Sequence, residues 1–231
     1  MSGVLFGLGM GPGDPELITL KAVRILSECP VVAYPAPEEG KSFVRGIANS
    51  FIKKSCVEIV IRTPMVAGKF PANDIYDFYA SEIRNYLEKG QNVAVLCEGD
   101  PFLYGSFSYI FLRLANEFNT EVVPGVSSLC ACSAAAKTPL VLRNQALSIV
   151  PATLSREELM AKILLGEPTA IMKIGRHLKK VRGLLTDMEL DESAYYVEHA
   201  SMKTQKVMKL SKTEGLEAPY FSMVLVCLRN P

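Results

Sequence analysis

The sequence predicts an α/β fold of two domains, with a mostly parallel N-terminal sheet and a mixed C-terminal sheet. Short apolar runs alternate with segments of helical periodicity along most of the 231 residues. Because 49% of the residues are hydrophobic, the chain can fill one large or two small cores. We place the domain boundary near Pro124, which gives domains of residues 1–124 and 125–231.

The N-terminal segment predicts a strand, a glycine loop and a helix. Val4 to Leu8 is apolar, and Gly9 to Pro15 interrupts the run. A helical pattern then starts at Glu16, with inward side chains at Leu17, Leu20, Val23 and Leu26. Asp14 can cap this helix through its carboxylate, and Pro15 suits the first helical position, where no N–H is needed.

The rest of the N-terminal domain continues the alternation. We expect strands at Val31–Ala33, ended by Pro35 and Pro37, and at Glu58–Ile61, Asn92–Cys97 and Glu121–Val123. Helices are expected at Ser42–Ile52, from Asn73 or Asp74 to a stop at Gly90, and in the apolar, aromatic segment after Pro101. The second of these helices is predicted to bury Ile75, Phe78, Tyr79, Ile83, Tyr86 and Leu87. Residues 63–72 form a Pro/Gly-rich loop between them.

The C-terminal domain repeats this style with different residues. Ser127 to Ala136 carries small residues, which suit a closely packed helix, and Ser155 with Glu158 forms a capping box for a helix to Leu165. A strand at Thr169–Ile174 and a helix at His177–Thr186 follow. The last strands are predicted at Ala194–Glu198, Lys206–Leu210 and Phe221–Leu228, the latter two as antiparallel neighbours.

The composition argues against nucleic acids and membranes as binding partners and favours a small molecule. With 25 basic and 24 acidic side chains, the chain lacks the positive charge on which non-specific nucleic-acid binding depends. It has no polybasic run for an anionic membrane and no apolar stretch near the roughly 18 to 20 residues of a membrane span. Six cysteines without an export signal predict reduced thiols and a cytoplasmic protein.

The spacing of Gly7, Gly9 and Gly11 after a strand resembles a dinucleotide-binding loop. The third glycine of that pattern falls on Pro12, however, and no acidic residue follows Val31–Ala33 to bind a ribose. A nicotinamide or flavin site is therefore the weaker hypothesis. A tight turn with close backbone approach explains the spacing as well as any binding role.

Two other groups could carry chemistry. Cys130 and Cys132 could suggest a metal, but both histidines lie far away in sequence, so buried inert thiols are the better interpretation and no metal site is predicted. His199 lies beside Glu198 after a predicted strand, where it either lines a pocket or caps an edge.

The segment Glu98 to Gly105 is more informative. Its two carboxylates follow a buried strand, where open α/β sheets place ligands, and bare carboxylates suit hydroxyl and ammonium groups rather than phosphate. Asp100 can also cap a helix that has Pro101 at its first position, and both interpretations can hold together.

Three motifs occur in order: Gly9 to Ala22, Glu98 to Phe102, and Val123 to Ser128. With them the chain resembles the tetrapyrrole methylases, the class III methyltransferases that use S-adenosylmethionine. The resemblance covers essentially the whole chain. Further segments are most similar to the subgroup that methylates precorrin-2 at C(20) in cobalamin biosynthesis, namely residues 32–35, 63–65, 99–105, 149–152 and 172–176.

The resemblance implies two α/β domains with the cofactor in a cleft between them, and a homodimer. It implies cofactor contacts at Pro12, Glu98, Gly99, Asp100, Leu103, Ser127, Ser128, Ile174, Ala200 and Phe221. Many relatives have Met in place of Ile174 and Gly in place of Ala200, and the alanine methyl narrows the cleft. The glycine loop, with Gly9, Gly11 and Gly13, would face the tetrapyrrole, whose carboxylates its N–H groups could meet.

Methyl transfer from a sulfonium requires mainly positioning of the nucleophilic meso carbon. That carbon must then lose a proton, for which Tyr104, His199, Glu198, bulk water and the substrate nitrogens are candidates. The substrate is acidic, so local basic residues should contact it: Lys41, Arg45, Lys69, Arg143, Lys173 and Arg176. Whether the substrate is metal-free or contains cobalt stays open, as do another substrate of this family and, less favoured, a nicotinamide-dependent oxidoreductase.

Overall fold

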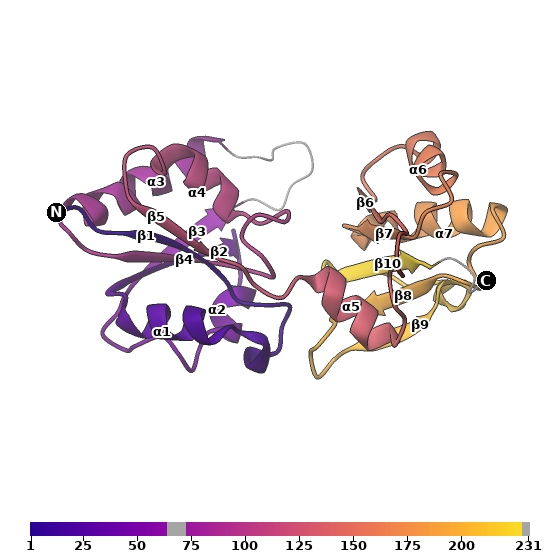
Figure 1. Cartoon of the computed structure of the whole chain (residues 1–231), viewed down its shortest axis with the longest axis horizontal. Helices are drawn as coiled ribbons and strands as arrows, with labels where there is room; N and C mark the ends of the chain where they lie inside the picture. The colour runs from indigo at the N-terminus through magenta and orange to yellow at the C-terminus, as the bar shows by residue number, and fades with distance from the viewer. Residues whose placement is uncertain (64–72, 228–231) are drawn as a thin grey trace. The chain divides into compact units, whose positions relative to one another are not determined.

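The computed structural model describes residues 1–63 and 73–227, and the chain divides into two compact units, Met1–Ser127 and Ser128–Pro231. Each unit has one five-stranded sheet with helices on both faces (Figure 1). The boundary predicted near Pro124 lies in the loop that ends the first unit.

The sheet of the first unit was predicted to be mostly parallel and is entirely so, with the order β3-β2-β4-β1-β5. Its strands are β1 Leu5–Gly9, β2 Val31–Pro37, β3 Val57–Thr63, β4 Val93–Cys97 and β5 Thr120–Val123. Every residue of β4 is buried, because this central strand is covered on both faces. The carboxyl ends of all five strands therefore lie along one edge of the sheet.

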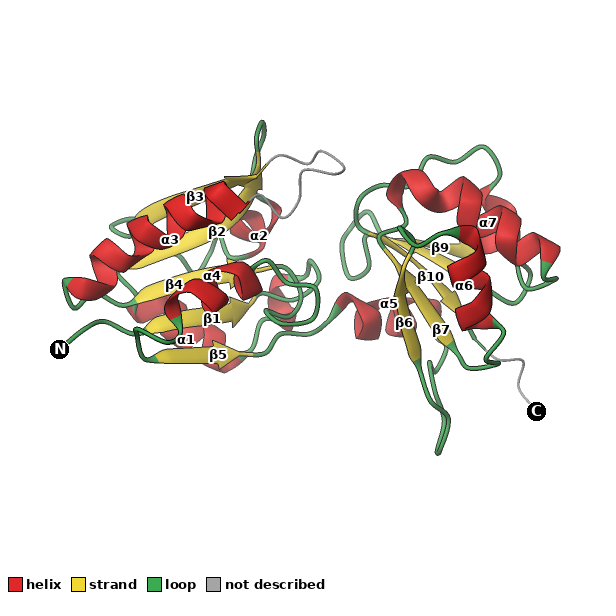
Figure 2. Cartoon of the chain, turned by 90° about the horizontal axis from the view of Figure 1, so that it is seen from above, coloured by secondary structure: helices red, strands yellow, loops and turns green. Residues whose placement is uncertain are grey.

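Alternating side chains of these strands fill two cores. Leu5, Val93 and Val95 pack with α3 (Asn73–Glu88) and α4 (Phe107–Leu114), whereas Leu8 and Leu96 pack on the opposite face. That second core is completed by α1 (Leu20–Glu28) and α2 (Phe43–Ile47), and both views show the two helix pairs on opposite sides of the sheet (Figures 1 and 2).

The first helix differs from its prediction. Asp14 accepts a hydrogen bond from the Glu16 N–H at 2.9 Å, but it caps only a short 3-10 turn, Pro15–Leu17. The α-helix starts at Leu20, where Thr19 is the N-cap, and Leu20 itself is 89% exposed. Two capping residues five positions apart thus divide the predicted helix into two.

Three further predictions in this unit were wrong, two about where an element ends and one about which side chain is buried. The helix predicted over Ser42–Ile52 is α2, which ends at Ile47, and Phe78 is 64% exposed because α3 turns Tyr76 and Ala80 to the core. Strand β2 continues through its prolines. It pairs with β4 only over Val31–Ala33, so the missing proline N–H groups fall where β2 has a single neighbour.

The sheet of the second unit is mixed, with the order β6-β7-β10-β8-β9. Its strands are β6 Ser148–Pro151, β7 Thr169–Met172, β8 Tyr195–Glu198, β9 Lys206–Lys209 and β10 Ser222–Val226. Only β6 and β7 are parallel neighbours, while β10 is antiparallel to both β7 and β8. Strand β6, which has four residues, was not predicted from the sequence.

The prediction that the last two strands are neighbours was wrong, because β9 pairs with β8 and not with β10. Burial explains the order. All five residues of β10 are buried, so it takes a central place, whereas β9 has lysines at both ends and forms the edge. The predicted end of β10, Leu228, lies outside the described residues.

Helix α5 (Ser128–Ala136) packs on one face of this sheet, and α6 (Arg156–Ile163) and α7 (Leu178–Asp187) pack on the other (Figure 1). Short 3-10 turns lie at Gly175–His177 and Leu210–Thr213. The capping box is confirmed, since Ser155 and Glu158 exchange hydrogen bonds of 3.1 and 2.8 Å at the start of α6. Among the described residues, every helix is too short or too polar to cross a bilayer.

Candidate functional site

Three motif loops meet at the carboxyl edge of the first sheet. Residues 9–13 follow β1, residues 98–105 follow β4, and residues 124–127 follow β5. Because these three strands are adjacent in the order β4-β1-β5 and parallel, loops far apart in the sequence come together. This is the edge at which open α/β sheets place ligands.

Glycine backbones pack directly on one another where these loops meet. A Cβ atom on Gly125 would lie 2.0 Å from the carbonyl oxygen of Gly99, and one on Gly9 would lie 2.5 Å from the Gly125 nitrogen. Gly11 and Gly99 form an isolated bridge, with N–H···O distances of 3.3 and 2.8 Å. The glycine spacing was interpreted either as a binding loop or as a tight turn with close backbone approach. The contacts of Gly9 support close backbone approach.

This packing affects the expected role of the glycine loop. The N–H groups of Met10 and Gly11 donate to the carbonyls of Cys97 and Gly99, so neither is directed at a substrate carboxylate. Gly9 is the last residue of β1, and Gly13 has a positive φ of 155°. Gly9, Gly11 and Gly13 were the three predicted substrate contacts. The N–H of Gly11 is already hydrogen-bonded within the protein.

Asp100 joins two of the motif loops. Its Oδ1 accepts hydrogen bonds from the N–H groups of Phe102 (2.9 Å) and Leu103 (3.0 Å), and its Oδ2 accepts one from Gly125 (3.2 Å). The capping interpretation is therefore right for the turn after β4, although the residues that follow are bends and not helix before α4. The same carboxylate also fixes the position of the loop after β5.

Glu98 is the second carboxylate of this edge, and it is half-buried. Burial raises the pKa of Glu98 above its usual value, and N–H groups, including that of Val44 in α2, partly offset the effect. Glu98 makes no ion pair among the described residues. A partly buried carboxylate without a cation is suited to accept hydrogen bonds from ligand hydroxyl or ammonium groups.

The remaining candidates of the first unit lie along the same edge. Pro12 is buried, and Leu103 and Ser127 are half-buried. Tyr104 is 50% exposed and has a φ of 57°, which is unusual for a residue other than glycine. The structure thus brings together the candidates of residues 9–13, 98–104 and 127.

In the second unit, three predicted cofactor contacts lie at one edge of the mixed sheet. Ile174 follows β7, Ala200 follows β8, and Phe221 precedes the antiparallel β10. The His199 N–H donates to the Phe221 carbonyl at 2.9 Å, which joins the last two segments. The Ile174 side chain is fully buried in the core, so any ligand contact there would come from its backbone. Ser128 is half-buried at the start of α5.

Glu198 and His199 differ in their surroundings. Glu198 is 4% exposed, accepts a hydrogen bond from the Tyr196 hydroxyl at 2.8 Å and pairs with Lys206 at 3.0 Å. Burial and the Glu198 carboxylate raise the pKa of Tyr196. His199 is half-buried, and its Nδ1 lies 3.3 Å from the Thr204 hydroxyl. Both carboxylate oxygens of Glu198 are therefore engaged within the sheet.

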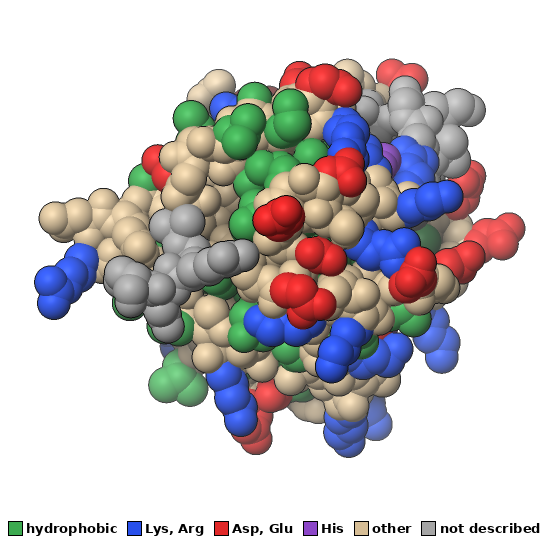
Figure 3. All heavy atoms as spheres, turned by 90° about the vertical axis from the view of Figure 1, so that its right-hand side faces the viewer, with side chains coloured by type: hydrophobic (Ala, Val, Ile, Leu, Met, Phe, Trp, Pro, Cys, Tyr) green, Lys and Arg blue, Asp and Glu red, His purple; other side chains and the backbone are tan. Residues whose placement is uncertain are grey.

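The basic residues predicted to contact an acidic substrate are scattered. Arg143, Lys173 and Arg176 are exposed in the second unit, and Lys69 lies outside the described residues. Arg45 forms two hydrogen bonds with Glu58, at 2.6 and 3.0 Å, which raise the pKa of Arg45 and lower that of Glu58. Figure 3 shows acidic and basic side chains intermixed on the face it presents, in agreement with the net charge of +1.

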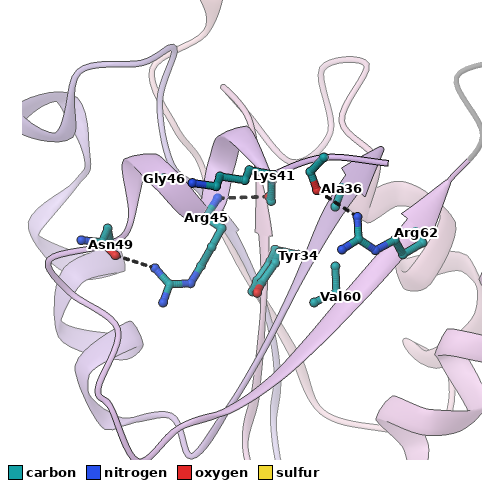
Figure 4. A pocket seen from close by; sticks show the side chains of 10 residues that line it. Tyr34, Ala36, Lys41, Arg45, Gly46, Asn49, Val60 and Arg62 are labelled. Carbon is teal, nitrogen blue, oxygen red and sulfur yellow. Dashed lines mark hydrogen bonds between the residues drawn. The ribbon is translucent and has the colours of Figure 1, made fainter. Parts of the chain in front are cut away.

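A cavity of about 330 Å³ lies beside α2, between the ends of β2 and β3 (Figure 4). We call it the α2 pocket, and it is lined by Tyr34, Ala36, Gly40, Lys41, Ser42, Arg45, Gly46, Asn49, Val60 and Arg62. The sequence analysis named Lys41 and Arg45 but missed Arg62. That residue lies inside β3, and nothing in the sequence separates it from an ordinary solvent-facing arginine.

The cysteines form no evident metal site. Within the described part of the chain, no group of three or more His, Cys, Asp or Glu residues is placed to hold a metal ion. Burial raises the pKa of the Cys132 thiol to about 12, as expected for an inert thiol. Cys130 was predicted to be buried and is exposed instead, because α5 turns Cys132 toward the sheet.

The chain matches known proteins along most of its length. A family model described as Tetrapyrrole (Corrin/Porphyrin) Methylases matches residues 4–214. The chain is 39% identical to a precorrin-2 C(20)-methyltransferase of a Sinorhizobium species, covering 98% of this chain and 97% of the relative. It is 27% identical to the cobalt-precorrin-2 C(20)-methyltransferase of Salmonella typhimurium, covering 98% and 97%.

Another similar relative is longer than this chain. The cobalamin biosynthesis protein CobIJ of Mycobacterium tuberculosis is 40% identical over 97% of this chain, which spans 46% of that relative, about half its length.

Solved structures share the fold. A cobalt precorrin-4 methyltransferase has a TM-score of 0.77 at 23% identity, covering 97% of this chain and 94% of that one. A uroporphyrin-III C-methyltransferase from Thermus thermophilus, complexed with S-adenosylhomocysteine, has a TM-score of 0.69 at 22% identity, covering 97% and 92%.

Proposed function

The chain belongs to the tetrapyrrole (corrin/porphyrin) methylase family, and from this premise we propose that it transfers a methyl group from S-adenosylmethionine to C(20) of precorrin-2. The observation that carries the proposal is the 39% identity, over nearly the full length of both chains, to a relative of that name. The lower identity of 27% to the cobalt-precorrin-2 enzyme favours the metal-free substrate.

The donor set at the carboxyl edge of the first sheet fits S-adenosylmethionine. When bound, this cofactor supplies an electrophilic methyl group on a sulfonium. Glu98 offers a partly buried carboxylate for ribose hydroxyls or the ammonium group, and the loops of Gly99, Leu103 and Ser127 are fixed beside it. Asp100 contributes by holding these loops, because its oxygens already accept three backbone N–H groups.

The second unit contributes Ser128, Ile174, Ala200 and Phe221 to the proposed cofactor contacts. Ile174 offers backbone groups only, since its side chain is buried. Ala200 is 7% exposed, and its methyl group belongs to the core against α5. Among these four, Phe221 is aromatic and half-buried, which suits contact with an apolar ring.

After methyl transfer the meso carbon must lose a proton. We favour His199 over Glu198 as the acceptor, because the Glu198 oxygens are engaged with Tyr196 and Lys206. In the tautomer whose Nδ1–H donates to the Thr204 hydroxyl, Nε2 is the ring atom that takes the proton. Tyr104, on the edge of the first sheet, is the third candidate.

Two further features belong to the proposal. A homodimeric enzyme is expected from the resemblance to the family. A cytoplasmic location is supported by relatives that are named as enzymes or proteins of cobalamin biosynthesis.

Calorimetric titration tests the cofactor first. S-adenosylhomocysteine is expected to bind once per chain, and NADH, the probe for an oxidoreductase, is expected not to bind. Anaerobic incubation with S-adenosylmethionine and precorrin-2 should then add one methyl group, which NMR would locate at C(20). No binding of S-adenosylhomocysteine, or methylation at another carbon, would contradict the proposal.

A further inference from the structure

The α2 pocket carries more positive charge than its neighbours balance. Of its three cations, Arg45 is neutralised by Glu58, which also accepts a hydrogen bond from the Tyr34 hydroxyl at 2.7 Å. Lys41 and Arg62 have no carboxylate partner among the residues that the structure describes. The pocket therefore suits an anionic ligand.

Arg62 is held in place rather than free to swing into solvent. Its Nη1 donates to the carbonyls of Pro37 at 2.8 Å and Gly40 at 3.0 Å, in the turn after β2. Figure 4 shows the side chains of Arg62 and Arg45 on either side of Tyr34. These two hydrogen bonds hold the guanidinium charge at one wall of the cavity. Because the Arg62 side chain is already ordered, little further side-chain entropy is lost when a ligand binds.

Part of the remaining lining is apolar, beside the polar Ser42 and Asn49. Ala36, Val60 and the ring of Tyr34 line the cavity together with the cations. A carboxylate on a short aliphatic chain matches both the cations and the apolar residues of the pocket. Its methylene groups can contact the apolar residues while its oxygens contact Lys41 and Arg62. A bare inorganic anion would leave the apolar wall without a partner.

The α2 pocket lies at the same edge of the sheet as the candidate cofactor site. It opens beside the carboxyl ends of β2 and β3, at the same edge of the parallel sheet as the motif loops. The backbone N–H of Val44 in α2 lowers the pKa of Glu98, so the helix that lines the pocket also acts on the motif loop after β4. A large ligand bound at this edge of the sheet would therefore lie on the same side of the unit as the α2 pocket.

We propose that the α2 pocket binds a carboxylate side chain of the tetrapyrrole substrate, with Lys41 and Arg62 as the recognising cations and α2 as the supporting wall. This rests on the proposed function, since it assigns part of that substrate to a place on the chain. The pocket thereby orients the macrocycle and contributes to the choice of the meso carbon that is methylated.

The test is binding of uroporphyrin III, a stable porphyrin with a carboxylate on every side chain, measured by fluorescence. Lys41→Ala removes one cation and no described contact. Gly46→Leu adds bulk in the pocket at constant charge, since a Cβ on Gly46 would meet nothing within 4 Å. Lys54→Ala is the matched control, because Lys54 is exposed and does not line the pocket. S-adenosylhomocysteine affinity is measured in parallel for every variant.

We expect Lys41→Ala and Gly46→Leu each to weaken porphyrin binding by roughly 3- to 10-fold. Lys54→Ala should leave it unchanged, and S-adenosylhomocysteine affinity should be the same in all four proteins. The octamethyl ester of the porphyrin should bind no better to the wild type than to Lys41→Ala. Citrate, a free carboxylate, should compete only weakly.

Other outcomes would overturn the proposal. Equal porphyrin affinity in the two pocket variants and the control, or no porphyrin binding by a wild type that binds S-adenosylhomocysteine, would remove the pocket from substrate binding. Tight citrate binding that leaves porphyrin affinity unchanged would assign the pocket to a free anion. Failure of the wild type to bind S-adenosylhomocysteine would instead contradict the proposed function itself.

Discussion

The two units differ in how they hold the sheet edge that carries their candidate site residues. In the first unit the edge is built from backbone, with Gly9, Gly99 and Gly125 in direct contact and Asp100 bonded to three N–H groups. In the second unit a single backbone bond, from the His199 N–H to the Phe221 carbonyl, is accompanied by side-chain bonds of Glu198 to Tyr196 and Lys206. The parallel sheet brings three loops to one edge, where only glycine allows them to touch.

The largest expected effect is that of Gly125→Ala, which tests the backbone packing of the first unit. The added Cβ would lie 2.0 Å from the Gly99 oxygen and 2.8 Å from the Gly9 carbonyl carbon, and both are backbone atoms that cannot move aside cheaply. We expect a loss of about 3 kcal/mol in the free energy of unfolding, measured by urea denaturation.

Gly46→Ala is the control for this substitution. Its Cβ would meet nothing within 4 Å, and alanine is the better helix former, so a gain of up to about 1 kcal/mol is expected. Equal stability of the two variants would show that the loops are less tightly packed than described.

The next effect concerns the side-chain edge of the second unit. Glu198→Ala removes the acceptor of the buried Tyr196 hydroxyl and the partner of Lys206, and we expect a loss of about 2 kcal/mol in unfolding free energy. Glu198→Gln keeps an acceptor for Tyr196 and should lose less than about 1 kcal/mol. If Glu198 is structural, Glu198→Gln retains methyl transfer, whereas His199→Gln lowers kcat.

Asp100 separates folding from cofactor binding in the first unit. Asp100→Ala leaves three N–H groups without their acceptor, and a loss of about 1 to 2 kcal/mol is expected. Asp100→Asn keeps an oxygen for Phe102 and Leu103 but not for Gly125, so its loss should be smaller. Calorimetry with S-adenosylhomocysteine then shows whether affinity follows loop order. Full affinity in a destabilised Asp100→Ala would make the residue purely structural.

The smallest effect is a pH dependence at Glu98. Its pKa is raised in the folded state by burial, so between its unfolded value near 4.5 and the raised value the folded protein binds more protons than the unfolded one. Stability therefore falls as pH rises through this window. Glu98→Gln removes the effect, and we expect it to be slightly more stable than wild type at neutral pH.

Glu58 contributes a pH dependence of the opposite sign, because Arg45 lowers its pKa, and Glu58→Gln removes that contribution. That stabilisation is present above the unfolded pKa and is lost as the pH falls through the lower, folded value. Thermal denaturation between about pH 2 and about pH 7, which spans the titration of carboxylates on both sides of their usual pKa, compares both variants with wild type. Parallel pH profiles of the two variants would contradict the assigned environments.

Several predictions from the sequence were confirmed because they depend on local physics. An uninterrupted apolar run predicted the buried strand β4. The spacing of Ser155 and Glu158, which is typical of a capping box, predicted the start of α6. The prediction failed where two local signals competed. Asp14 and Thr19 both cap, so the first helix starts four residues later than expected, at Leu20 instead of Glu16.

The sequence by itself determined the alternation of strands and helices, the parallel first sheet and the family, because apolar periodicity and motif order are properties of the chain. The tertiary structure alone decided which residues share a site. Gly9, Gly99 and Gly125 meet only because β4, β1 and β5 are neighbours, and Arg62 joins Lys41 only because β3 lies beside β2. Strand order is set by how much apolar surface each strand buries against the whole sheet, a quantity that no short segment contains.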